Sequence, residues 1–175
     1  GDLVRCDASG VTNFTYMFYQ AGYNATEFNL GTLGNWNVSS VATDMSYMFN
    51  EAGYNATTWS VGSLSGWNTS GVTNFTYMFY KAGYTGSTFD LGDIGSWGVS
   101  SSAINVDYMF NEAGYSATTW SIGDISTWNL TGLSAMKYTF YKTGYSASEY
   151  NLGNLGLWNM SSITDLTQTF AYAGY

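Results

Sequence analysis

The feature that most constrains the fold of this chain is internal repetition. The segment W-N-T-S-G-V-T-N-F-T-Y-M-F-Y-K-A-G-Y, residues 67–84, returns with substitutions about every thirty residues along the whole sequence. Repetition at that period is typical of a stack of similar units, each of which buries its apolar face against its neighbours. The sequence therefore predicts one continuous solenoid with no linker.

Columns of equivalent residues show how regular the repetition is. A glycine column recurs at intervals of 30 or 31 residues, and a phenylalanine and a tryptophan column keep step with it. The members are Gly22, Gly53, Gly83, Gly114, Gly144 and Gly174; Phe18, Phe49, Phe79, Phe110, Phe140 and Phe170; and Trp36, Trp67, Trp97, Trp128 and Trp158. A further position holds Phe or Tyr in odd repeats and Trp in even ones, so the full period is a pair of repeats.

Each repeat divides into three predicted elements. Phe28-Asn29-Leu30 and its equivalents alternate in hydropathy as a strand does, and a glycine follows as a corner. L-x-x-W-x-V predicts a second strand, and V-x-x-F-x-x-M-F-x-x-A places its apolar residues on one face of a short helix. The predicted fold class is thus an α/β repeat solenoid, with two parallel-ladder strands and one helix per repeat. Its six repeats are 1–30, 31–61, 62–91, 92–122, 123–152 and a truncated 153–175.

Composition excludes several functions. Four Lys and Arg against twelve Asp and Glu give a net charge of -8, which disfavours nucleic acid as a partner. The chain has no His, and its single cysteine, Cys6, falls in the tryptophan column, where we expect a small buried hydrophobe. We therefore expect no enzyme activity and no cofactor. A calcium site from Asp90, Asp93 and Asp124 matches no known motif. No run of residues predicts membrane insertion, and the polar, Lys-poor surface favours an extracellular or cell-surface location.

The segment W-N-T-S-G-V-T-N-F-T-Y-M-F resembles the W-D-x-S-x-V-T-x-M-x-x-M-F repeat of bacterial surface proteins. That is the DUF285 family, also grouped with BspA-like proteins and distantly related to leucine-rich repeats. Residues 158–170 match it in spacing, and residues 36–49 match with one insertion. The resemblance implies a leucine-rich-repeat-like solenoid, a secreted or cell-surface location and an adhesive or structural role, with no catalytic residues. The chain departs from the family pattern by its longer repeat, by Asn after Trp and by its many tyrosines.

Eight N-x-S/T sequons are candidate N-glycosylation sites. They are Asn13, Asn24, Asn37, Asn55, Asn68, Asn74, Asn129 and Asn159. Several of them directly follow a tryptophan of the column and are expected to point outward. The alternative interpretation of these residues is a hydrogen-bonded ladder of asparagines. Asn24 and Asn55 lie just after the predicted helix, where a covalent glycan has more room.

Tyrosine forms three columns, each with two interpretations. Stacked rings can simply pack repeat on repeat, or they can form an exposed aromatic strip that binds sugar or protein. We expect packing for the column that follows the glycine. The candidate contact surface is the column found only in odd repeats, together with the lysines that follow two of its members: Tyr19, Tyr80, Tyr141, Lys81 and Lys142.

Two functions fit these observations. The first is a structural extracellular protein that forms or extends a fibre or stalk, because both ends of the sequence cut through a repeat and open solenoid ends expose strand edges. Such ends predict either a longer parent protein or self-association end to end. The alternative is an adhesin-type module that binds glycan or protein through its aromatic strip.

Overall fold

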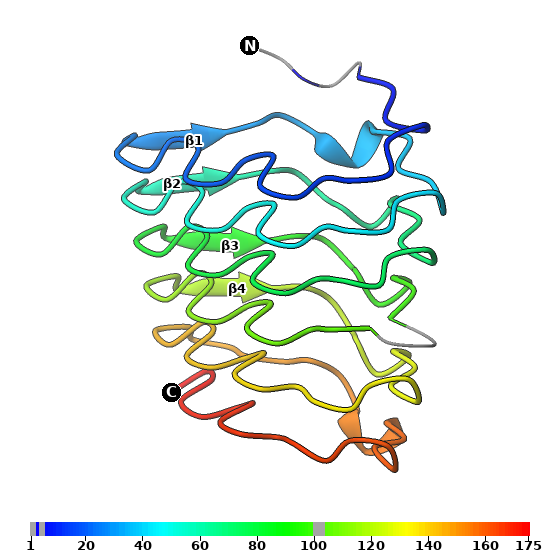
Figure 1. Cartoon of the computed structure of the whole chain (residues 1–175). Coiled ribbons are helices and arrows are strands. Elements are labelled where there is room, and N and C mark those ends of the chain that lie inside the picture. The colour runs from blue at the N-terminus through cyan, green and yellow to red at the C-terminus, as the bar shows by residue number, and fades with distance from the viewer. Residues whose placement is uncertain (1–2, 4–5, 100–103) are drawn as a thin grey trace.

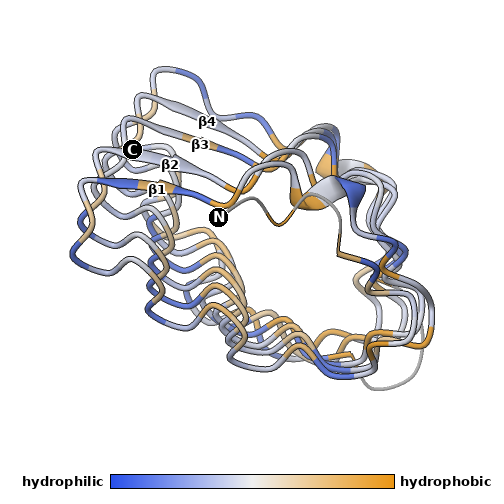
Figure 2. Cartoon of the chain, turned by 90° about the horizontal axis from the view of Figure 1, so that it is seen from above, coloured by the Kyte–Doolittle hydropathy of each residue, from blue (hydrophilic) through white to orange (hydrophobic). Residues whose placement is uncertain are grey.

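The computed structural model describes Leu3, residues 6–99 and residues 104–175. The chain winds through successive turns that lie one above another, and its two termini lie at opposite ends of the stack (Figure 1). Seen from above, these turns follow nearly the same elongated outline (Figure 2). Residues 30 or 31 apart in the sequence are therefore neighbours, as between Asn55 and Asn24, whose side chains hydrogen bond at 2.9 Å.

One wall of the stack consists of short parallel strands. These are β1 (Glu27–Asn29), β2 (Thr58–Ser60), β3 (Thr88–Asp90) and β4 (Thr119–Ser121). β1 pairs with β2 and β3 pairs with β4, each in the register that the sequence columns predict, with Phe28 opposite Trp59 and Phe89 opposite Trp120. The central aromatic residue of each strand is buried and its first residue is exposed, which is the two-residue alternation of a half-buried strand. We call these strands and their equivalents the strand strip.

The predicted helix is wrong. The described residues contain no α-helix, and the segment with helical spacing is a run of tight turns. Here Met78 N donates to Phe75 O three residues back, while Phe79 N donates to Met109 O in the next repeat. A helix would need these N–H groups for bonds four residues back, so pairing between repeats replaces it. We call this segment the turn strip: residues 12–23, 43–54, 73–84, 104–115, 134–145 and 164–175.

Left-handed backbone conformations make these turns possible. Two positions in each turn strip carry a non-glycine residue with φ between +49° and +59°, such as Tyr77 and Lys81. Gly83, which the sequence suggested as a helix cap, also has a positive φ of 56°. Within the turn Phe75–Met78, Tyr77 is the third residue, which is where a type II turn requires a positive φ.

The predicted second strand is also absent from the described residues. The L-x-x-W segments turn sharply, since Trp67 N donates to Leu64 O at 3.1 Å. Two of these segments are assigned as short 3-10 helices, η1 (Leu33–Asn35) and η2 (Leu155–Leu157). The apolar residues point inward as predicted, but the backbone reaches that position through a turn.

The core is continuous from repeat to repeat. Phe49, Phe79 and Phe110 are fully buried, and their rings stack at centroid distances of 5.2 and 5.4 Å. Trp67 and Trp97 stack at 6.1 Å. In the tryptophan column each indole N–H donates to a main-chain carbonyl of the preceding repeat, as Trp67 does to Leu33 at 2.9 Å. These bonds satisfy the indole N–H groups, which would otherwise be buried without a partner.

The expected burial of Cys6 is wrong, because its side chain is exposed. Cys6 belongs to repeat 1, whereas Trp36, Trp67, Trp97 and Trp128 of the same column have a repeat on either side. Within the described part of the chain, no helix is long and apolar enough to cross a membrane.

Candidate functional site

Two tyrosine ladders run along the turn strip. Tyr47, Tyr77 and Tyr108 stack at centroid distances of 5.0 and 4.6 Å, with ring planes within 12° of parallel. The second ladder begins at Tyr23 and Tyr54, which stack at 4.9 Å, and continues to Tyr175. Each ring covers the face of the next, so the inner members of both ladders have no free faces for a sugar ring, whereas the end members Tyr16 and Tyr175 are exposed.

The candidate contact tyrosines are arranged differently. Tyr80 meets Tyr77 edge to face, with centroids 5.4 Å apart and planes at 66°. Tyr19 and Tyr141 meet the same ladder in the same way, at 5.4 and 5.5 Å. Tyr19 is 43% exposed, and Tyr80 and Tyr141 are half-buried. These rings are not stacked on one another, so they do not cover one another's faces.

The two candidate lysines lie beside these rings. The ammonium groups of Lys81 and Lys142 each lie 5.2 Å from the ring centroid of the preceding tyrosine. Lys81 also pairs with Glu112 at 3.5 Å. Burial acts to lower the pKa of Lys81, but the charge of Glu112 and then Tyr80 outweigh it and raise the pKa. The structure therefore brings Tyr80 and Lys81 together as one charged aromatic group, and Tyr141 and Lys142 as another.

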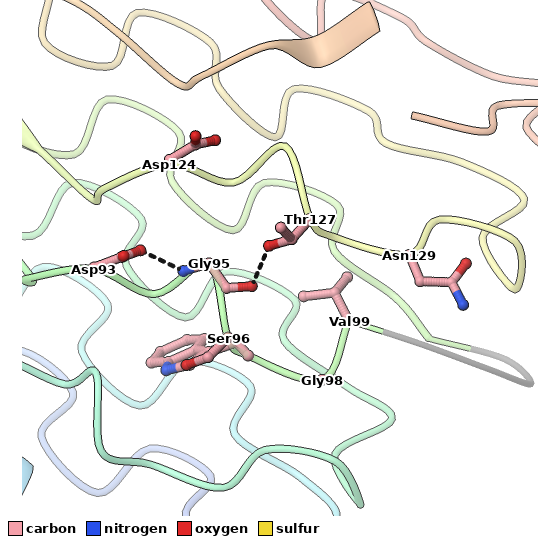
Figure 3. A pocket seen from close by; sticks show the side chains of 9 residues that line it. Asp93, Gly95, Ser96, Gly98, Val99, Asp124, Thr127 and Asn129 are labelled. Atoms are coloured by element: carbon pink, nitrogen blue, oxygen red, sulfur yellow. Dashed lines mark hydrogen bonds between the residues drawn. The ribbon is translucent and has the colours of Figure 1, made fainter. Parts of the chain in front are cut away.

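A shallow hollow of about 680 Å³ lies elsewhere, on the wall that carries Gly98 (Figure 3). Asp93, Asp124, Thr127 and Asn129 supply its polar lining. Asp93 accepts the Gly95 N–H at 2.9 Å, and Thr127 donates to the Gly95 carbonyl at 2.8 Å. Trp97 contributes to the floor but is only 2% exposed, so the hollow offers hydrogen bonds without an aromatic face.

The sequence did not predict this hollow, although it departs from the repeat pattern at one of the lining residues. Gly98 replaces the asparagine that follows tryptophan in the other repeats. Hydrogen bonds from the Ser126 side chain and N–H hold the pKa of Asp124 below its ordinary value, so this carboxylate is charged at neutral pH. Asp90 instead binds the N–H of Gly92. In the described residues no group of three or more His, Cys, Asp or Glu could hold a metal ion, and the Asp90, Asp93 and Asp124 set remains a sequence pattern only.

The sequon asparagines differ in how free their side chains are. Seven are exposed and Asn74 is half-buried, with its amide nitrogen 3.3 Å from Asp44 Oδ2. Asn55 donates to Asn24, which is the ladder type of bond, although at a different column from the one expected. In Asn68 and Asn129 the side-chain oxygen accepts the N–H two residues ahead. These bonds do not involve the amide nitrogen, which is the atom that would carry a glycan.

Comparison with known proteins identifies the chain. Residues 1–119 and 54–174 match the family described as Mycoplasma protein of unknown function, DUF285. The chain belongs to this family. The resemblance found in the tryptophan and Met-Phe motifs is thereby confirmed for DUF285. No curated protein and no solved structure matches the chain.

The exposed apolar side chains of this DUF285 chain follow no sequence motif. The exposed large apolar side chains gather in the first and last repeats: Val11, Tyr16, Met17 and Tyr19 in repeat 1, and Leu157, Met160, Leu166, Phe170, Tyr172 and Tyr175 in repeat 6. Among the described residues only Val41 is of this kind elsewhere. Met17 is 49% exposed, whereas its equivalents Met48 and Met78 are 0% exposed, so position in the stack decides its exposure.

Proposed function

We propose that this DUF285 chain is a structural solenoid that forms or extends an extracellular fibre or cell-surface stalk. The observation that carries the proposal is the continuous stacking of equivalent Phe, Trp and Tyr residues from repeat to repeat. A further repeat can extend these columns. It would cover the apolar side chains that are exposed in the first and last repeats.

Two further features support a structural role. The polar surface carries few charges, with 9% charged residues in all, which suits close packing of copies. The tyrosine ladders pack repeat against repeat, and an aromatic pair contributes about 0.5–1.5 kcal/mol beyond its burial. The net charge of -8 and the absence of His from the sequence support an extracellular, non-enzymatic role, with no cofactor and no nucleic acid partner.

Sedimentation and electron microscopy of the purified chain test this proposal. We expect particle length to grow with protein concentration, and filaments whose axial period equals one or two repeats. The control is the same protein in a low concentration of urea, where the apolar end contacts weaken before the chain unfolds. A single monomeric species at every concentration would contradict the proposal.

Covalent glycans are a second part of this proposal. Asn68, Asn129 and the other exposed sequon residues could carry a glycan at the surface, whereas the contact of Asn74 with Asp44 disfavours modification there. Intact mass of the protein from its natural source, before and after glycosidase treatment, measures this. A mass equal to that of the polypeptide would contradict it.

The adhesin alternative depends on Tyr19, Tyr80 and Tyr141. It is supported by their orientation across the stacked ladder and by the lysine beside two of them. Glycan-array binding that Tyr80→Ala and Tyr141→Ala together abolish would favour this alternative. Tyr115→Ala is the matched control, because Tyr115 is a stacked member of the neighbouring ladder. An array without binding would count against the alternative.

A further inference from the structure

One column of the turn strip alternates between tyrosine and asparagine. It holds Tyr19, Asn50, Tyr80, Asn111 and Tyr141 in repeats 1 to 5. Repeats 2 to 5 have a repeat on either side, so the alternation there belongs to the body of the stack and not to its ends. Neighbouring rings of the adjoining tyrosine ladder are 4.6–5.0 Å apart. The tyrosines of the alternating column therefore recur about every 10 Å, which is twice the spacing of parallel strands.

The tyrosines of this column turn one ring face away from the ladder. Both faces of Tyr77 are covered by Tyr47 and Tyr108, whose rings stack on it. Tyr80 meets Tyr77 with ring planes at 66°, so the edge of Tyr77 lies against one face of Tyr80. The second face of Tyr80 therefore points away from the ladder. Tyr141 is oriented in the same way, at 68° to its own ladder ring.

The asparagines between these rings are buried, and their side-chain amides have no described hydrogen-bond partner. Asn50 is 5% exposed and Asn111 is 4% exposed. Among the described residues, the fully enclosed side-chain polar atoms without a partner amount to Thr15 Oγ1 alone, so the two amides still reach the surface of the stack. Polar groups as buried as these are normally hydrogen-bonded. The two amides are therefore points at which the hydroxyl groups of a ligand can bond.

A column of mostly charged side chains borders these residues. Lys81 pairs with Glu112 at 3.5 Å, and Glu51 accepts a hydrogen bond from Gln20 at 2.7 Å. Lys142 continues the column in repeat 5. The two carboxylates and the two ammonium groups balance, so an uncharged ligand that is rich in hydroxyl groups fits this border better than an anion or a cation does.

We propose that the alternating column binds an extended polysaccharide of β-1,4-linked hexoses that runs along the stack. The inference rests on the adhesin alternative and names its ligand. Such a polysaccharide advances by about 5 Å per sugar, close to the height of one repeat. Alternate sugars are turned over, so its structural period is two sugars, like the period of the column. A tyrosine face would stack on every second sugar, and an asparagine amide would bond the hydroxyl groups of the sugar between.

Calorimetric titration with oligosaccharides of two to six β-1,4-linked sugars tests this match of periods. The probes are oligomers of glucose, N-acetylglucosamine and mannose. The matched control is the hexamer of α-1,4-linked glucose, which is helical and not extended. We expect binding by β-1,4-linked probes of at least one sugar type. Their affinity should rise about two- to tenfold each time two added sugars reach another tyrosine.

Two results of this titration would overturn the inference. One is that no β-1,4-linked hexamer binds. The other is that the α-1,4-linked hexamer binds as tightly as the β-1,4-linked one, because then the extended shape of the ligand would not matter.

Variants of the column test the role of each residue type. Tyr80→Ala removes the central ring and should lower the affinity for the hexamer about tenfold, whereas Tyr80→Phe keeps the ring and should lose much less. Asn111→Ala should lower the affinity about two- to tenfold, because it removes hydrogen bonds to the ligand. Tyr115→Ala, in the stacked ladder, is the matched control and should bind like the original chain.

Circular dichroism establishes that each variant is folded. Full affinity in Tyr80→Ala, or a loss in Tyr115→Ala as large as the loss in Tyr80→Ala, would overturn the inference.

The same measurements separate this inference from the adhesin alternative. If ligands found on the glycan array require Tyr80 and Tyr141 but no β-1,4-linked oligosaccharide binds, the adhesin alternative stands and this inference fails. If no glycan binds, both fail. The structural function is independent of either outcome, because it needs no ligand.

Discussion

The turn strip and the strand strip line the same core but hold their backbones differently. In the strand strip, Thr58, Trp59 and Ser60 form a short parallel strand that pairs with Glu27, Phe28 and Asn29 of the preceding repeat. In the turn strip, tight turns have left-handed residues at fixed positions, and hydrogen bonds between repeats run both ways: Met45 N donates forward to Asn74 O, whereas Thr43 N donates backward to Thr12 O. The comparison shows that stacking of repeats does not require strands. It requires only that N–H and carbonyl groups face along the stack.

The largest expected effect tests whether both strips belong to one core. Phe79 of the turn strip and Phe89 of the strand strip are fully buried and meet edge to face at 6.3 Å. Each change to alanine should lower the free energy of unfolding by about 3–5 kcal/mol, measured by urea denaturation. Thr88→Ala, at an exposed position of β3, is the control and should change it by less than about 0.5 kcal/mol. A small loss at Phe79 alone would show that the turn strip unfolds separately.

A middle-sized effect concerns the indole hydrogen bonds. Trp67 donates to the carbonyl of Leu33 in the preceding repeat, whereas Trp59 of the strand strip donates to Ala52 in its own repeat at 3.0 Å. Trp67→Phe should cost at least about 0.5–1.5 kcal/mol, because it removes the indole hydrogen bond, although the Leu33 carbonyl still accepts the Trp36 N–H. The Trp59→Phe change should cost less, since odd repeats hold Phe28 and Phe89 at that position. Equal losses of stability in the two variants would show that the hydrogen bond between repeats contributes no more than the one within a repeat.

A smaller effect distinguishes a turn from a helix directly. Glu51 lies in the turn strip with φ of +54°, where a residue with a side chain is strained by about 1–2 kcal/mol. Glu51→Gly should therefore unfold at a higher urea concentration than Glu51→Ala. An α-helix would reverse the order, because glycine is about 1 kcal/mol worse than alanine there. Ser63, which is exposed and has no positive φ, is the control position and should prefer alanine.

The sequence predicted which residues face inward better than it predicted the backbone. Val72, Phe75, Met78 and Phe79 are all buried, as the apolar spacing required. Their offsets of three and four residues fit a helix, but consecutive three-residue turns produce nearly the same offsets. Two features argue against a helix: the glycine of (A/T)-G-Y lies close to the segment, and bulky Tyr residues occupy positions that are left-handed. Neither feature can be recognised as a sign of tight turns within a single repeat. Pairing between repeats decides the conformation.

The functional surfaces were predictable only in part. The columns placed Tyr80 and Lys81 side by side, but only the structure shows that the neighbouring tyrosine ladders have covered faces. Likewise, the columns aligned the repeats, but only the structure shows which backbone groups of the turn strip pair from repeat to repeat.

The smallest effect is expected at alkaline pH, where a tyrosine of the turn strip titrates and the variant chosen on the strand strip does not. Burial, and then the neighbouring rings of Tyr108, Tyr47 and Tyr80, raise the pKa of Tyr77 from 10.0 to about 12. The unfolded chain loses this proton near pH 10, while the folded chain keeps it. The contribution of Tyr77 to stability is therefore complete below pH 10 and is lost as the pH rises through about 12.

Tyr77→Phe should make the alkaline fall in stability shallower, as measured by urea denaturation at several pH values between 8 and 12. Denaturation at pH 8, where the phenol is neutral in both states, supplies the reference for any change in packing. Thr88→Ala on the strand strip should leave the slope of this fall unchanged, because it removes no titrating group. If Tyr77→Phe and the original chain lose stability in parallel up to pH 12, the stacked ladder does not protect its phenols, and the rings of the turn strip are more open to water than their spacing of 4.6–5.0 Å indicates.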